Sequence, residues 1–141
     1  MFVLDTNVVS ELMREHPNDG VLAWVDSQVA ETLFVTAVTE AEIRTGIAIL
    51  PDGQRRRLLN DAAERAFGVY FSNRILAFDS GAAQLYALIA ADRRAAGRPI
   101  SQADCQIAAI ARSHGSAVAT RNVDDYTGCG IEVFDPWSAR V

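Results

Sequence analysis

The stretch FVLDTNVVSEL, residues 2–12, decides how this sequence folds. Residues 2–4 are apolar and indicate a short buried strand, and Asp5 follows them directly. From Thr6 onward the apolar positions follow helical spacing, so we expect the strand to lead straight into a helix. The acid at this junction needs an explanation, because Asp is both a favoured helix N-cap and a good ligand for a divalent cation.

The same alternation of short apolar strands and helices continues along the chain. Such a pattern is typical of an α/β fold with a mostly parallel sheet covered on both faces. In sheets of this kind, ligands bind at the carboxyl ends of the strands, which is where Asp5 lies. Further strands are predicted at 33–35, 75–77, 117–119 and 131–134, and helices at 21–29, 37–50, 54–67, from residue 82 to near Gly97, and after an N-cap at Ser101.

Length and composition exclude several classes of protein. A chain of 141 residues fits one domain, which we expect to span residues 1–141. There is no apolar run of about 18 residues and no secretion signal, so a membrane span is not expected and a cytoplasmic location is. The two cysteines are not in a CxxC spacing and the two histidines are isolated, which argues against a zinc site and for free thiols.

Charge narrows the chemistry further. The net charge of −5 argues against broad, non-specific affinity for nucleic acid, although a carboxylate cluster that binds Mg²⁺ would itself contribute to this charge. All 13 cationic side chains are Arg and there is no Lys. A Walker-type phosphate loop and Schiff-base chemistry both require Lys, so both are excluded.

Each acid that follows a predicted strand has a structural explanation of its own. Asp5 can be an N-cap, and Thr39 with Glu42 matches a capping box, unless the helix begins earlier, at Thr36, and Glu42 lies in its second turn. Ser101 and Asp104 form a similar pattern, but they open a largely apolar helix, where a buried carboxylate without a partner is costly.

Together these acids point to a site. The carboxyl ends of parallel strands converge, so polar groups that follow strands one, two and four are expected to meet there, with Asp104 opening a nearby helix. Clustered carboxylates repel each other unless a cation lies between them. Mg²⁺ prefers oxygen ligands and keeps several waters, which suits hydrolysis of a phosphodiester.

Four segments in this order resemble the PIN-domain ribonucleases, and more closely the VapC-type toxins of bacterial toxin–antitoxin pairs in their FitB-like branch. The segments are VLDTNVVSEL (3–12), AEIRTG (41–46), ADCQIAAIA (103–111) and VATRNVDDY (118–126), and the closing Phe134-Asp135-Pro136-Trp137 also fits. The resemblance implies a PIN-domain fold with about five short strands flanked by helices, and an endoribonuclease that depends on Mg²⁺ or Mn²⁺.

The resemblance also assigns roles to residues of this chain. It places the catalytic acids at Asp5, Glu42 and Asp104. Asp5 and Asp104 are the expected metal ligands, and Glu42 contributes to metal binding directly or through water. A fourth catalytic position, often acidic in the family, falls on Asn122, which brings no charge. Asp125, or with less support Asp124, is the candidate to replace this fourth acid. The resemblance leaves open whether the site binds one metal ion or two.

The partners implied by the resemblance are an RNA substrate, a second copy of the chain in a homodimer, and a cognate antitoxin. The tail of the antitoxin is expected to block the active site, and operator DNA is expected to be bound only through the antitoxin.

Several neighbouring residues allow two interpretations each. Asn7 orients Asp5 or completes the first helical turn, and Thr120 bonds a ligand carboxylate or ends a strand. Arg44 and Arg121 meet RNA phosphate or an antitoxin acid, but a solvated surface position is favoured. The Arg55–Arg57 run is favoured as a solvated face, and Phe67, Tyr70 and Phe71 as core or dimer contacts.

Two rival functions fit parts of the pattern. An aspartyl-phosphate phosphatase would use Asp5, but that chemistry usually needs an acid at position 7, which is Asn, and a supporting Lys. A non-catalytic partner-binding module with a degenerate metal site is the second alternative, and Asn122 is the residue that favours it.

Overall fold

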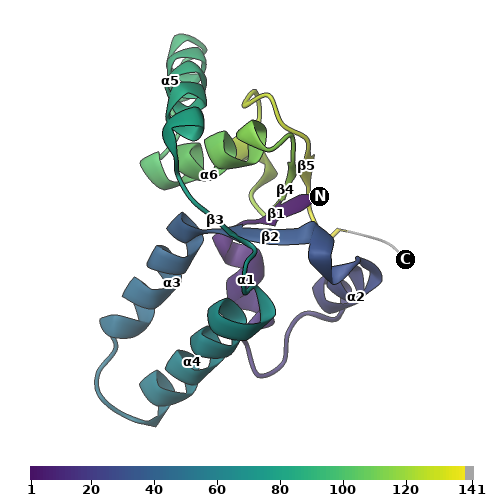
Figure 1. Ribbon diagram of the computed structural model, residues 1–141, viewed down its shortest axis with the longest axis vertical. Coiled ribbons are helices and arrows are strands. Elements are labelled where there is room, and N and C mark those ends of the chain that lie inside the picture. Colours follow the sequence, from purple (N-terminus) through teal and green to yellow (C-terminus); the bar gives the residue numbers. More distant parts are fainter. Residues whose placement is uncertain (139–141) are drawn as a thin grey trace.

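Five short strands form one parallel sheet at the centre of the molecule (Figure 1). The structure is a computed structural model that describes residues 1–138. The strands lie in the order β3-β2-β1-β4-β5, so the strand that opens the chain is central. Their bounds are β1 (Phe2–Leu4), β2 (Leu33–Thr36), β3 (Ile75–Leu76), β4 (Ala117–Ala119) and β5 (Val133–Phe134).

Except for α4 (Gln54–Arg65), which follows Gly53, the α-helices of residues 1–138 begin where a side chain accepts backbone N–H groups that the first turn leaves unpaired. In residues 1–138 this role falls to Asp5, Asn18, Thr36, Asp79 and Ser101. The α-helices are α1 (Thr6–Leu12), α2 (Asp19–Ser27), α3 (Ala37–Ala48), α4 (Gln54–Arg65), α5 (Ser80–Ala95) and α6 (Gln102–Ser113). Short helical turns are η1 (Ala30–Thr32), η2 (Ala66–Tyr70), which is π-helical, and η3 (Val123–Tyr126).

The two faces of the sheet are covered by different helices, as Figure 1 shows: α5 and α6 lie on one side, and α1 to α4 on the other. Successive residues of β1 divide between the two cores, because side chains alternate along a strand. Leu4 packs with α1 to α4, whereas Val3 packs with α5 and α6. Burial of both faces explains why the strands are continuous apolar runs instead of alternating ones.

The chain leaves β1 in one direction to build β2 and β3, and places β4 and β5 on the other side. The strand order therefore reverses between β1 and β4. Ligands of open parallel sheets bind at such a switch point, outside the carboxyl ends of the strands. The residues that follow β1 and β4 are Asp5 and Thr120, and they meet at this edge.

The expected elements are present, with differences at their ends. The strands predicted at 75–77 and 131–134 are two residues each, and the helix predicted over 54–67 ends at Arg65 and passes into η2. Cys105 and Cys129 are free, as expected, and both are buried. In residues 1–138, no helix is both long and apolar enough to cross a membrane.

Candidate active site at the carboxyl ends of the strands

Asp5 lies at the end of the central strand and is only 5% exposed. It is the N-cap of α1, because its Oδ1 accepts the backbone N–H of Thr6 at 2.7 Å. Burial raises the pKa of Asp5, and the negative charge of Asp104 raises it further, while hydrogen bonds from Thr120, Thr6 and Tyr126 act in the opposite direction. The capping explanation is therefore correct but incomplete, since the second oxygen faces the site.

Thr120 and Asn7 hold the second oxygen of Asp5 in place. The hydroxyl of Thr120 donates to Oδ2 of Asp5 at 2.8 Å and accepts from the side-chain amide of Asn7 at 3.1 Å. The direct contact from the Asn7 amide to Asp5 is long, at 3.5 Å, so Asn7 acts on the acid mainly through Thr120. The backbone N–H of Arg121 donates to Oδ1 of Asn7 at 3.2 Å, and the backbone N–H of Asn122 donates to the hydroxyl of Thr120 at 3.0 Å. Both sequence-based interpretations of Thr120 apply, since it ends a strand and bonds the acid.

Asp104 lies in the first turn of α6, which Ser101 caps through the backbone N–H of Asp104 at 3.2 Å. The helix is buried, but the carboxylate itself is only half-buried. The hydroxyl of Tyr126 donates to its Oδ1 at 3.3 Å. Burial, followed by the charges of Asp5 and Asp104, raises the pKa of Tyr126, so this hydroxyl stays a proton donor.

Glu42 projects from the second turn of α3, because the helix begins at its N-cap Thr36 and not at Thr39. The capping-box interpretation of Thr39 and Glu42 is therefore wrong. The side chain of Glu42 is exposed, and its Oε1 accepts the hydroxyl of Thr6 at 2.7 Å. This bond joins the acid of α3 to the residue that follows Asp5.

The four residues assigned from the sequence line one cleft of about 570 Å³. Asp124 and Asp125, the candidate substitutes for a fourth acid, do not line it, whereas Asn122 does. Asn122 lies exposed at the start of η3. The complete lining is Asp5, Thr6, Asn7, Ser10, Glu11, Arg14, Glu42, Asp104, Arg121, Asn122 and Trp137.

The fit of a divalent cation rests on the two inner acids. In residues 1–138, no group of three or more Asp, Glu, His or Cys side chains is already gathered as a metal site would need. Asp5 and Asp104, however, are close enough for each charge to oppose the other, and neither forms an ion pair in the described part of the chain. Mg²⁺ is commonly bound by one or two carboxylates with water and phosphate completing its shell, so this pair fits such an ion. Glu42, bonded to Thr6, lines the same cleft.

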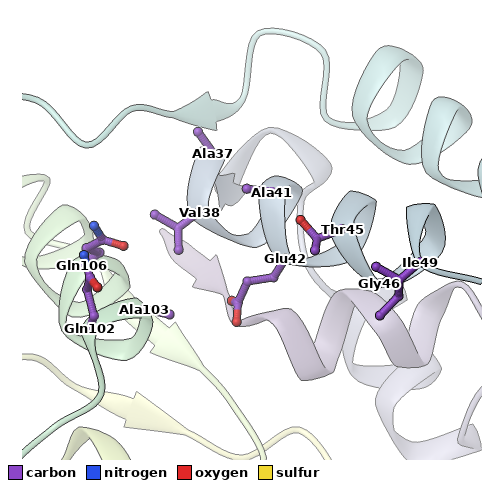
Figure 2. Close-up of a pocket in the computed structure, with 10 residues that line it drawn as sticks. All are labelled: Ala37, Val38, Ala41, Glu42, Thr45, Gly46, Ile49, Gln102, Ala103 and Gln106. Carbon is purple, nitrogen blue, oxygen red and sulfur yellow. The ribbon is translucent and has the colours of Figure 1, made fainter.

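A larger, shallow groove of about 870 Å³ adjoins the cleft and shares Glu42 with it. Figure 2 shows Glu42 reaching from α3 toward the start of α1, with Val38 and Ala103 facing each other across the gap between α3 and α6. The floor is mostly small or apolar, and the amides of Gln102 and Gln106 border it on α6. Glu42 is therefore the acid that lies between the cleft and the groove.

Sequence reasoning missed part of the cleft. Ser10, Glu11 and Arg14 line it together with Asn7, which the sequence had already singled out. They lie three, four and seven residues after Asn7, and this helical spacing is the signal that would have found them. Tyr126 was also missed; a large aromatic with a hydroxyl needs a polar partner when buried, and this one is 1% exposed.

Other residues weighed from the sequence are structural. Arg44 forms ion pairs with Glu40 and Glu64 at 2.8 and 2.7 Å, so it is neither free in solvent nor part of the cleft. Phe67 and Phe71 belong to the core, as expected, whereas Tyr70 is 43% exposed. Arg55 and Arg57 are exposed, and Arg56 pairs with Asp52 at 2.6 Å.

Proteins of known family are similar to this chain over nearly its whole length. The VapC ribonuclease Y4jK of Sinorhizobium fredii is 42% identical over 137 residues, which are 97% of this chain and 98% of that protein. The toxin FitB of Neisseria gonorrhoeae is 40% identical over 137 residues, 97% of this chain and 99% of FitB. The solved structure of FitAB bound to an IR36 DNA fragment contains a chain with a TM-score of 0.92 and 39% identity, covering 100% of this chain and 99% of that one. The family model of the PIN domain matches residues 2–126 of the sequence, and the chain therefore belongs to the PIN domain family.

Proposed function

We propose that this protein is an endoribonuclease that depends on Mg²⁺, or on Mn²⁺, and acts as the toxin of a VapBC-like toxin–antitoxin pair. The observation that supports the activity is the meeting of Asp5, Glu42 and Asp104 at one cleft, from three elements far apart in the sequence. The names of the relatives, VapC ribonuclease and toxin FitB, support the same assignment.

Asp5 and Asp104 would hold the cation, because they are the two carboxylates whose charges oppose each other. The ion, when bound, supplies positive charge that stabilises the transferring phosphoryl group and promotes ionisation of water. Thr120, Asn7 and Tyr126 hold the oxygens of the two acids in fixed orientations.

Glu42 is the third of the predicted catalytic carboxylates, and we assign it the role of general base. It is exposed in the cleft, and one of its oxygens is held by Thr6 while the other has no hydrogen bond in the described part of the chain. In hydrolysis, a water oxygen forms a bond to phosphorus as the bond from phosphorus to the leaving oxygen breaks. The attacking water loses a proton, which Glu42 accepts directly or through a second water.

The test is cleavage of a defined RNA pool by the purified chain, with the ends of the products mapped. We expect internal cuts with Mg²⁺ and none with EDTA. Asp5→Asn and Asp104→Asn should each reduce the rate at least a hundredfold, which is the scale of losing an electrostatic contact in a reaction centre. Asp61→Asn, an exposed acid of α4, is the matched control and should cut like wild type. Equal rates for all four proteins would contradict the proposal.

A non-catalytic partner-binding module is the second candidate, and the neutral Asn122 in the cleft favours it. Calorimetry with Mn²⁺ separates the two functions. If the protein is a nuclease, Mn²⁺ should bind to it and Asp5→Asn should abolish that binding. If the protein is a binding module, no heat of binding should be detected at millimolar Mn²⁺.

The partners are proposals of the same kind. We propose that an antitoxin blocks the cleft and carries the DNA-binding function, and the solved structure of FitAB bound to an IR36 DNA fragment supports a DNA-bound pair. Co-expression with a candidate antitoxin, followed by co-purification and loss of RNA cleavage, tests this proposal. We also expect a homodimer in the cytoplasm, which light scattering of the purified chain measures.

A further inference from the structure

A cationic side chain lies over an aromatic ring among the residues that line the cleft. The guanidinium carbon of Arg121 is 5.2 Å from the centre of the Trp137 ring. Both residues line the cleft that contains the three acids, although Trp137 comes from the segment after the last strand. Neither side chain has a role in the mechanism described above.

The residues that line the cleft, all within the described range 1–138, carry more acids than cations. Its walls carry four acids, Asp5, Glu11, Glu42 and Asp104, against two cations, Arg14 and Arg121. Arg14 is paired with the buried carboxylate of Glu11 at 3.1 Å. In the part of the chain that the structure describes, no ion pair includes Arg121. Arg121 is therefore the one cation among these lining residues that is available to an anionic ligand.

The backbone fixes both members of the pair. The N–H of Arg121 donates to Oδ1 of Asn7 at 3.2 Å, so the residue is tied to the network that orients Asp5. The N–H of Trp137 donates to Oδ1 of Asp135 at 2.8 Å, and the half-buried ring packs against the core. In residues 1–138 the guanidinium of Arg121 donates no hydrogen bond, so its planar set of N–H donors can match two phosphate oxygens.

We propose that Arg121, held on the ring of Trp137, binds a phosphate that flanks the scissile one in single-stranded RNA. The acids of the cleft would repel this polyanion, and Arg121 supplies the opposite charge beside them. The inference rests on the proposed nuclease function and adds the residue that positions its substrate.

The binding test uses the full-length chain in an Asp5→Asn background, which should not cut, with Mg²⁺ present and a fluorescein-labelled single-stranded RNA as the probe. Arg121→Ala should weaken binding about tenfold, as expected for the loss of one charge-assisted contact. The slope of log affinity against log salt should fall by about 0.7, the value for one single-strand phosphate contact. Arg94→Ala, an exposed Arg of α5 outside the cleft, is the control and should change neither quantity.

Two further variants separate charge from stacking. Arg121→Lys should keep the salt slope and recover part of the affinity, because the charge remains while the planar donor edge is lost. Trp137→Leu keeps an apolar contact to the core, and should raise KM with little change in kcat in the wild-type background. A purely structural role of the pair would instead lower thermal stability and leave KM unchanged.

The outcomes distinguish this inference from the function on which it rests. If the wild-type chain does not cut RNA, the proposed function fails. If it cuts, and Arg121→Ala has the affinity, salt slope and KM of Arg94→Ala, the inference is wrong and the nuclease stands. Unchanged RNA binding together with a weakened antitoxin complex would also overturn it, because the pair would then serve the partner protein.

Discussion

The Oδ2 atom of Asp5 accepts a hydrogen bond of 2.8 Å from the hydroxyl of Thr120, which is 115 residues away in the sequence. The bond joins the ends of β1 and β4, the two strands between which the sheet reverses its order. Both groups are buried, so water cannot replace the bond when it is broken. The orientation of the central acid therefore depends on the pairing of these two strands.

Replacement of Thr120 by Val should destabilise the protein and change its pH dependence. The variant leaves a buried carboxylate oxygen without its donor, which costs about 1–3 kcal/mol in the free energy of unfolding. The Thr120 hydroxyl lowers the pKa of Asp5, so its loss should raise that pKa and move the acidic limb of the pH–rate profile to higher pH. Urea unfolding and the pH profile of cleavage measure both effects, and Thr120→Ser, which keeps the hydroxyl, is the control. Identical behaviour of the two variants would show that the bond is without consequence.

Asp5→Asn should raise the thermal stability of the metal-free protein at neutral pH. Burial raises the folded pKa of Asp5 above its ordinary value of 3.8, so the ionised form is unfavourable in the folded chain. The contribution of Asp5 to stability is fully present below the unfolded pKa and is lost as the pH rises through the folded one. We expect a gain of about 1 kcal/mol, typical of single stabilising substitutions at functional sites.

Calorimetric melts in EDTA at pH 4 and pH 7 test this gain, which should be larger at pH 7. Asp61→Asn is the control, since that acid is exposed on α4. A gain that is the same at both pH values would contradict the assigned cause.

Tyr126→Phe should weaken metal binding more than it weakens the fold. The substitution conserves volume and removes a hydroxyl that donates to Asp104, so unfolding should change by about 1 kcal/mol. Loss of a group that orients a metal ligand typically costs about 10- to 100-fold in affinity. Calorimetric titration with Mn²⁺ measures this loss, and Tyr86→Phe, outside the cleft, should leave the affinity at the wild-type value.

Both thiols should be unreactive in the folded protein. Burial raises the pKa of Cys105 to about 11 and also raises the pKa of Cys129, so neither is a thiolate at pH 8. Each residue is 1% exposed. Ellman's reagent should therefore detect no thiols in native protein and two in denaturant. Fast labelling of the native chain would show that these segments open readily.

The sequence by itself determined the local structure and indicated the residues of the candidate site. Apolar runs predicted the strands, and Ser101 marked the start of α6, because helix caps and strand patterns depend on residues within a few positions of each other. Asp5, Glu42 and Asp104 could be identified as site candidates because each occupies the end of a strand or the start of a helix. A parallel sheet brings such ends to one edge, whatever the details of its packing.

Tertiary structure alone decided which side chains meet at that edge. The bonds from Thr6 to Glu42, from Tyr126 to Asp104 and from Thr120 to Asp5 join separate elements. The contact of Arg121 with Trp137 also depends on where the segment after β5 lies relative to the end of β4. No local pattern encodes these contacts, because they follow from strand register and helix packing, where a shift of one residue turns a side chain to the opposite face.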